Sequence, residues 1–180
     1  MKISFNAPFT LTFTILATLI YFLFIQHNIF SDIFILQGRA NIDDWHWYAG
    51  TLFYTLGHAD FNHLVGNFMF ILLLGPIVEN HYGTRKLILM VIITAIFTSI
   101  IHVLFWDHNI IGASGIVFML IILSALIPSR GKEIPLTFVL IIILYIGKEI
   151  LGSFSHDNIS HFAHISGGLL GALLGFKAKT

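Results

Sequence analysis

The sequence lacks cysteine altogether and carries little charge. With no cysteine among its 180 residues, disulfides and thiolate chemistry are excluded. Charged residues make up 10% of the chain, against about 25% in ordinary soluble domains. Nine Lys and Arg residues balance nine Asp and Glu residues, so there is no excess of basic charge to attract nucleic acid. Because 57% of the residues are hydrophobic, the composition predicts a protein embedded in a membrane.

Six apolar segments predict six transmembrane helices, since a crossing needs roughly 20 mainly apolar residues. The segments are residues 8–25, 61–78, 87–105, 114–127, 135–151 and 162–176. The fourth and sixth are short, which predicts that they lie within the bundle and do not face lipid along their whole length. No repeat or linker divides the chain, so we expect one all-α membrane domain over residues 1–180.

The basic residues predict how this bundle is oriented. If the N-terminus is cytoplasmic, seven of the nine Lys and Arg residues lie on the cytoplasmic side, and only Arg39 and Lys148 lie on the other. Cytoplasmic loops carry such an excess of positive charge. We therefore expect both termini in the cytoplasm, with the second, fourth and sixth segments running inward from the outer face. The long first loop contains the aromatic stretch Trp45-His46-Trp47-Tyr48, which we expect at headgroup level.

Polar residues stand at the start of the second, fourth and sixth segments. They are His63 with Asn67, Ser114 within Gly112-Ala113-Ser114-Gly115, and His164. Because the three segments run in the same direction, these residues are expected at one depth, just below the outer surface. Polar groups within a membrane are costly, so each is a functional candidate.

Ser114 and His164 supply the pair of residues that nucleophilic catalysis requires. A serine attacks a carbonyl only if a neighbouring base takes its proton, and a histidine, with a pKa of about 6.5, suits that role. The transition state also needs donors aimed at its developing oxyanion. His63 and Asn67, four residues apart on one helix face, are candidates. The Ser114 N–H, in a first helical turn without an acceptor, is a third.

A glycine stripe in the sixth segment explains how base and nucleophile could meet. Gly167, Gly171 and Gly175 recur every four residues, a spacing that allows close helix packing in lipid. His164 shares this face, so packing of the stripe on the fourth segment would bring it to Ser114. Each feature also has a structural interpretation, because small residues are common in membrane helices and a single membrane histidine more often serves packing.

Three motifs in chain order resemble those of the rhomboid family of intramembrane serine proteases, in its six-helix bacterial form. They are His63-x-x-x-Asn67, Gly112-x-Ser114-Gly115, and Ala163-His164-x-x-Gly167-x-x-x-Gly171. The resemblance implies that Ser114 is the nucleophile and His164 the general base of a catalytic dyad. It further implies that His63, Asn67 and the Ser114 N–H form the oxyanion hole.

The same resemblance implies an intramembrane serine endopeptidase that cleaves transmembrane segments near the outer leaflet. Its partners would be transmembrane protein substrates and the lipid bilayer, with no cofactor, metal or nucleic acid. The chain would be a multi-pass protein of the cell (inner) membrane. Glu79 with Gly83 resembles the cytoplasmic turn of the family, in which the acid is structural.

The chain also departs from the family pattern. Members often have Trp-Arg in the first loop, where this chain has Trp45-His46-Trp47. Phe118 stands where a tyrosine often stacks on the catalytic histidine, and a phenyl ring can stack equally well. His58 is expected either to support the site or to lie at the membrane interface. His102 has no explanation in the sequence.

Three other functions compete with this interpretation. A noncatalytic rhomboid-like module would bind membrane proteins for quality control, although such relatives typically lose the serine or the histidine. A metal-dependent membrane protease would need His-Glu-x-x-His or an equivalent, which the sequence lacks. A transporter would show repeated halves, and none are visible.

Overall fold

The computed structural model describes residues 3–127, 133–147 and 161–178, and the regular structure in these ranges is helical. The α-helices are α1 (Pro8–Ile20), α2 (Trp45–Phe53), α3 (Phe61–Tyr82), α4 (Thr84–Phe105), α5 (Ser114–Leu126), α6 (Leu136–Ile141) and α8 (His161–Lys177). Two π-helical turns, η1 (Tyr21–Ile25) and η3 (Ile142–Ile146), continue α1 and α6, and η2 (Ser31–Phe34) is a short 3₁₀ helix. The all-α prediction is therefore confirmed for the described residues.

Each of the six predicted segments contains a helix, with shifts at the ends. Helix α3 continues to Tyr82, four residues past the predicted end, and α4 begins at Thr84. Residues 148–151 of the predicted fifth segment lie outside the described residues. Within the part of the chain that the structure describes, three helices are long and apolar enough to cross a membrane, namely Pro8–Ile25, α3 and α4.

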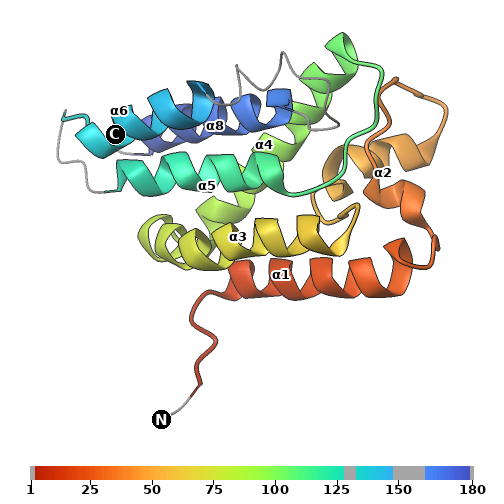
Figure 1. The fold of residues 1–180 in the computed structure, drawn as a ribbon, viewed down its shortest axis with the longest axis horizontal. Helices are drawn as coiled ribbons and strands as arrows, with labels where there is room; N and C mark the ends of the chain where they lie inside the picture. Colours follow the sequence, from red (N-terminus) through yellow and green to blue (C-terminus); the bar gives the residue numbers. More distant parts are fainter. Residues whose placement is uncertain (1–2, 128–132, 148–160, 179–180) are drawn as a thin grey trace.

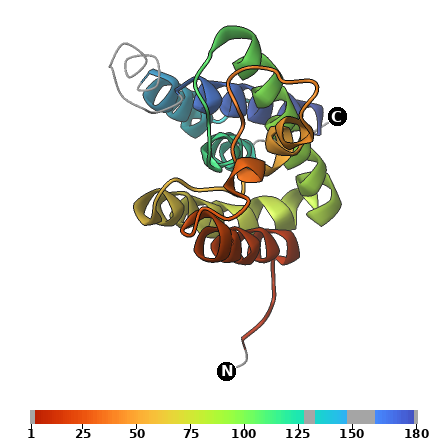
Figure 2. The ribbon, with the colours of Figure 1, turned by 90° about the vertical axis from the view of Figure 1, so that its right-hand side faces the viewer.

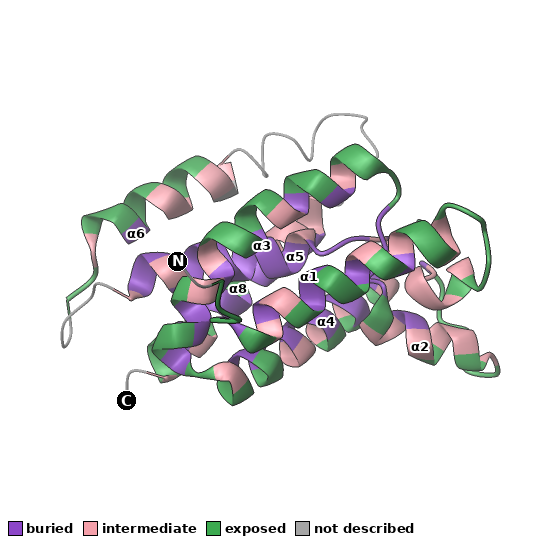
Figure 3. Ribbon diagram, turned by 90° about the horizontal axis from the view of Figure 1, so that it is seen from below, coloured by how far each residue is buried: buried purple, intermediate pink, exposed green. Residues whose placement is uncertain are grey.

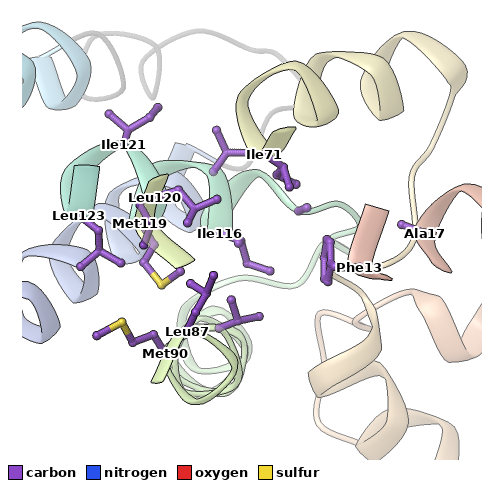
Figure 4. Packing of buried hydrophobic residues seen from close by; sticks show 14 of the residues in the cluster. Phe13, Ala17, Ile71, Leu87, Met90, Ile116, Met119, Leu120, Ile121 and Leu123 are labelled. Atoms are coloured by element: carbon purple, nitrogen blue, oxygen red, sulfur yellow. The ribbon is translucent and has the colours of Figure 1, made fainter. Parts of the chain in front are cut away.

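Helix α5 occupies the interior of the bundle, as expected for the short fourth segment. It has 13 residues, and 11 of them are buried. Figure 3 shows buried positions concentrated on α5, while exposed positions recur along α3 and α6. Figure 4 shows Met119 and Leu120 of α5 packing near Leu87 and Met90 of α4. Helix α5 thus forms the centre of the bundle, in contact with α3, α4, α6 and α8.

Helices α5 and α8 make the most extensive helix contact among the described residues, and glycines permit it. A Cβ atom at Gly171 would lie 2.8 Å from the Met119 carbonyl oxygen, and one at Gly167 would collide with Gly115. The two helices run side by side in the same direction (Figure 1). The predicted packing of the glycine stripe on the fourth segment is confirmed.

The end of the bundle where α3 turns into α4, here called the Glu79 end, is closed by a carboxylate. Glu79 accepts hydrogen bonds from the Phe9 N–H at 2.8 Å, the Thr10 N–H at 3.0 Å, and the Thr10 and Thr84 hydroxyls at 2.8 Å each. A negative charge at the N-terminus of α1 is also favoured by the helix dipole. Gly83 makes the turn with φ of 85°. Glu79 thus joins α1, α3 and α4, in agreement with a structural role.

The first loop lies against the segment that precedes α5. Its aromatic stretch opens α2, whose N-terminus is capped by the Asp44 carboxylate through the His46 N–H. Leu36 and Ile110 exchange two backbone hydrogen bonds, at 2.9 and 3.0 Å. Figure 2 shows the loop, in orange, beside the far end of α4 and the chain that follows it. The loop therefore supports the chain that leads to Ser114.

Candidate active site

Helices α3, α5 and α8 all begin at one end of the bundle, here called the cavity end (Figure 1). A cavity of about 440 Å³ lies there. His63 from α3, Ser114 from α5 and His164 from α8 are among the residues that line it. The structure thus brings together three of the four side chains that the sequence singled out, although they are up to 101 residues apart in the chain.

Ser114 is the first residue of α5 and is partly exposed to the cavity. As the first residue of a helix, its N–H has no acceptor within that helix. The chain before it is fixed by a hydrogen bond from the Gly112 N–H to the Tyr54 carbonyl oxygen, at 2.9 Å. Gly112 has φ of 122°, a conformation that side chains rarely allow. The backbone that carries the Ser114 hydroxyl and N–H is therefore fixed in position.

The His63 ring lies directly against the backbone that precedes the serine. A Cβ atom at Gly112 would be 2.6 Å from the ring nitrogen Nε2, so a glycine is required there for space as well as for conformation. Asp60 caps α3 by accepting the His63 N–H at 2.8 Å. This cap places His63 in the first turn of the helix, at the same level as Ser114.

Asn67 lies one turn deeper in α3 and is 6% exposed. Its side-chain amide donates to the backbone carbonyl of His63 at 3.0 Å, and it is not among the residues that line the cavity. An asparagine amide has two N–H groups, so one donor remains for another acceptor. This local hydrogen bond fixes the orientation of the amide, a detail that the sequence does not reveal.

His164 is held by an aromatic stack. Its ring lies parallel to that of Phe118, with centroids 4.5 Å apart and an interplanar angle of 9°. Phe118 in turn meets Tyr145 edge to face at 5.6 Å. The predicted stack between Phe118 and His164 is confirmed, and it fixes the plane of the imidazole beside the cavity.

Polar residues of α4 and α8 pack behind this cavity, and sequence reasoning had missed them. The Thr98 and Ser166 hydroxyls are hydrogen-bonded at 2.8 Å, and the Ser166 hydroxyl lies 3.0 Å from the Ala163 carbonyl oxygen. Thr94, Thr98 and His102 recur at four-residue spacing in an otherwise apolar helix, a signal that could have identified this face. These contacts tie α4 to the first turn of α8, which carries His164.

Tyr54 is another cavity residue that the sequence had not indicated. It follows α2, its ring is buried, and burial raises the pKa of its hydroxyl.

Among the described residues, no group of three or more His, Asp or Glu side chains is arranged to hold a metal ion.

The chain is similar to one known protein family and to several individual proteins. The family model described as "Rhomboid domain" matches residues 44–179. Rhomboid protease GlpG of Yersinia pestis (strain Pestoides F) is 27% identical over 183 residues, which cover 94% of this chain and 62% of that protein. GlpG of Photorhabdus laumondii is 28% identical over 93% of this chain and 60% of its own length.

A plant protein is also similar. Rhomboid-like protein 11, chloroplastic, of Arabidopsis thaliana is 29% identical over 136 residues, which cover 67% of this chain and 49% of that protein. The chain thus spans between 49% and 62% of the length of these three relatives. Because the rhomboid domain model matches more than half of its residues, the chain belongs to the rhomboid family.

Proposed function

We propose that this protein is an intramembrane serine endopeptidase that cuts transmembrane segments of other membrane proteins near the outer leaflet. One observation carries the proposal: Ser114, His164 and His63, from three helices, line a single cavity at the end of the bundle where those helices begin. The named relatives that cover most of this chain are rhomboid proteases, which favours the same activity.

The reaction we propose is acyl transfer through a Ser114–His164 dyad. The Ser114 hydroxyl oxygen attacks the carbonyl carbon of the scissile peptide bond while His164 takes the hydroxyl proton. The tetrahedral intermediate collapses when the C–N bond breaks and His164 returns that proton to the leaving amine. Water then attacks the acyl-enzyme ester, with His164 again as base, and releases the second product together with free Ser114.

Three N–H donors would stabilise the oxyanion of the tetrahedral intermediate. They belong to the Ser114 backbone, the His63 ring and the Asn67 side chain. The Ser114 N–H lies at the start of α5, the His63 ring lies against Gly112, and Asn67 keeps one amide N–H beyond its bond to the His63 carbonyl. Donors fixed in advance cost no reorganisation when the charge develops, which is the basis of their catalytic effect.

In the membrane, we propose six crossings with both termini in the cytoplasm, as in a multi-pass protein of the bacterial inner membrane. The distribution of Lys and Arg supports this orientation. It puts the cavity on the outer side, where water can reach it. A substrate helix must unwind locally before its carbonyl reaches Ser114, so helix-destabilising residues and a small residue before the cut are expected in substrates.

Cleavage of a fluorescent transmembrane substrate by the purified protein in liposomes tests this function. Ser114→Ala and His164→Ala should each lower turnover by about ten-thousand-fold, because the two residues act as one unit. Ser124→Ala on the same helix, whose hydroxyl bonds to the Ile121 carbonyl, and His81→Ala at the Glu79 end are matched controls and should cleave like wild type. If Ser114→Ala or His164→Ala cleaves as fast as wild type, the proposed dyad is wrong.

A noncatalytic module that binds membrane proteins is the second candidate. The name of the Arabidopsis relative describes it as rhomboid-like and not as a protease, which keeps this candidate open. The same liposomes distinguish the two functions, since a binding module would retain the substrate intact, with equal retention by wild type and Ser114→Ala.

A further inference from the structure

A second histidine lies behind His63 without reaching the cavity. His58, in the turn between α2 and α3, is 0% exposed and is not among the residues that line the cavity. Its Nδ1 lies 3.3 Å from the Leu56 carbonyl oxygen, so Nδ1 carries the proton and donates it. Nε2 is then an acceptor, and this buried atom has no hydrogen-bond partner among the described residues. A fully buried imidazole with one unsatisfied nitrogen is costly and needs an explanation.

The His58 ring is in contact with the ring of His63. The two centroids are 5.2 Å apart with an interplanar angle of 68°, an edge-to-face arrangement. The His58 ring also contacts the Phe68 ring edge to face, with centroids 5.7 Å apart. His63 therefore lies between two fixed neighbours, the His58 ring and the Gly112 backbone. With both in place, its ring has little freedom to rotate away from the serine.

The charge state of His58 suits such a supporting role. Burial, and to a smaller extent the nearby His63, lowers the pKa of His58 to about 4, while the hydrogen bond to Leu56 and the charge of Asp60 oppose the shift. The ring is thus neutral at neutral pH. A neutral neighbour neither repels His63 nor competes with it for the negative charge of an oxyanion.

We propose that His58 is a positioning residue of the oxyanion hole, which holds the His63 ring over Gly112 so that Nε2 faces the oxyanion formed at Ser114. The inference rests on the proposed function and adds to it a residue that touches neither substrate nor reacting atoms. His58 acts only through His63, and this distinguishes it from a residue that merely stabilises the fold.

A double-mutant cycle tests this dependence. Turnover of the transmembrane substrate is measured for His58→Ala in the wild-type background and in the His63→Ala background. Residues in contact are energetically coupled, so His58→Ala should lower kcat by about tenfold with His63 present. In the His63→Ala background the same change should lower it by less than about twofold. The Michaelis constant should stay near its wild-type value, and His58→Phe, which keeps an aromatic ring, should restore most of the kcat.

His102→Ala is the matched control, because His102 is also 0% exposed at the cavity end and has no ring contact with His63. Any loss of kcat that His102→Ala causes should be the same in the wild-type and His63→Ala backgrounds. Where His58→Ala does not fold, His58→Leu, which also removes the ring, replaces it in the cycle. Where cleavage by His63→Ala is too slow, the rate of labelling by a serine-directed phosphonate replaces turnover.

Two outcomes overturn the inference while the proposed function stands. One is an equal loss for His58→Ala with and without His63, and the other is a wild-type kcat for His58→Ala. Failure of the proposed function gives a different result, because Ser114→Ala would then match wild type whatever residue occupies position 58.

Discussion

At one end of α3, Glu79 is 4% exposed and accepts four hydrogen bonds from residues of α1 and α4. Near the other end of the helix, sixteen residues or about 24 Å away, His63 faces a cavity and Asn67 has a second side-chain N–H besides the one that binds the His63 carbonyl. Both ends bring polar groups into an apolar bundle. At the Glu79 end the carboxylate accepts hydrogen bonds from neighbouring helices, whereas at the cavity end we propose that the donors of Ser114, His63 and Asn67 bind the oxyanion.

The contrast shows how buried polar residues of a membrane protein can be sorted. A group whose hydrogen bonds are satisfied within the protein lowers the energy of one arrangement of helices and has no capacity left for chemistry. A group that is held in place with a donor or lone pair to spare is suited to a substrate. Glu79 belongs to the first kind, and we propose that Ser114 and His63 belong to the second.

Loss of the Glu79 carboxylate should cause the largest change in stability. In Glu79→Ala, the N–H groups of Phe9 and Thr10 and two hydroxyls lose their acceptor. Each buried donor left unsatisfied costs about 1–3 kcal/mol, so we expect the free energy of unfolding to fall by about 3 kcal/mol or more. Thermal unfolding in detergent measures this loss. The protein that remains folded should keep its turnover per molecule, and a selective loss of turnover without a loss of stability would contradict the comparison.

Removal of the Phe118 ring should lower turnover rather than stability. In Phe118→Ala, His164 loses the parallel stack that fixes its plane, and we expect kcat to fall by about fivefold, the usual worth of an aromatic contact. Phe118→Tyr should keep the stack and the activity. Turnover in liposomes measures the effect, and an unchanged kcat for Phe118→Ala would show that the stack does not hold the base.

His58 should make the stability of the cavity end depend on pH. Its pKa is about 4 in the folded protein and about 6.5 when unfolded. Between these values the unfolded chain binds a proton that the folded chain does not, so stability falls as the pH decreases from 7 towards 5. In His58→Phe this contribution disappears, and the slope of unfolding temperature against pH should become flatter. An identical slope in both proteins would mean that His58 protonates in the folded state.

The smallest effect is expected from an exposed ion pair near the same end. Arg39 and Asp107 are 2.9 Å apart, join the first loop to the chain before α5, and are both largely exposed. The hydrogen bond from Arg39 holds the pKa of Asp107 below its usual range. Exposed pairs contribute little, so Arg39→Ala should change turnover by less than about twofold. The Leu36–Ile110 hydrogen bonds remain in that variant. A larger loss would assign the ion pair a part in holding Ser114.

The sequence predicted those features that depend on neighbours along the chain. Helix α5 begins at Ser114 as expected, and the glycine stripe of α8 packs on it, because apolar runs and small-residue spacing are local signals. Contacts between segments that are distant in the chain cannot be predicted from such local signals. The edge-to-face contact of His58 with His63 and the Leu36–Ile110 bridge depend on how the first loop folds back, which no periodicity records. The side-chain hydrogen bond of Asn67 likewise depends on a side-chain orientation that no sequence pattern specifies.

Labelling of Ser114 by a serine-directed phosphonate, located by mass spectrometry, tests the central claim most directly. The reagent bonds covalently only to a serine whose proton a neighbouring base can take. We expect one adduct, on Ser114, in the wild type, and a rate of labelling lower by about a thousandfold or more in His164→Ala. Labelling of another serine, or an equal rate in His164→Ala, would contradict the account of Ser114 and His164 as a catalytic pair.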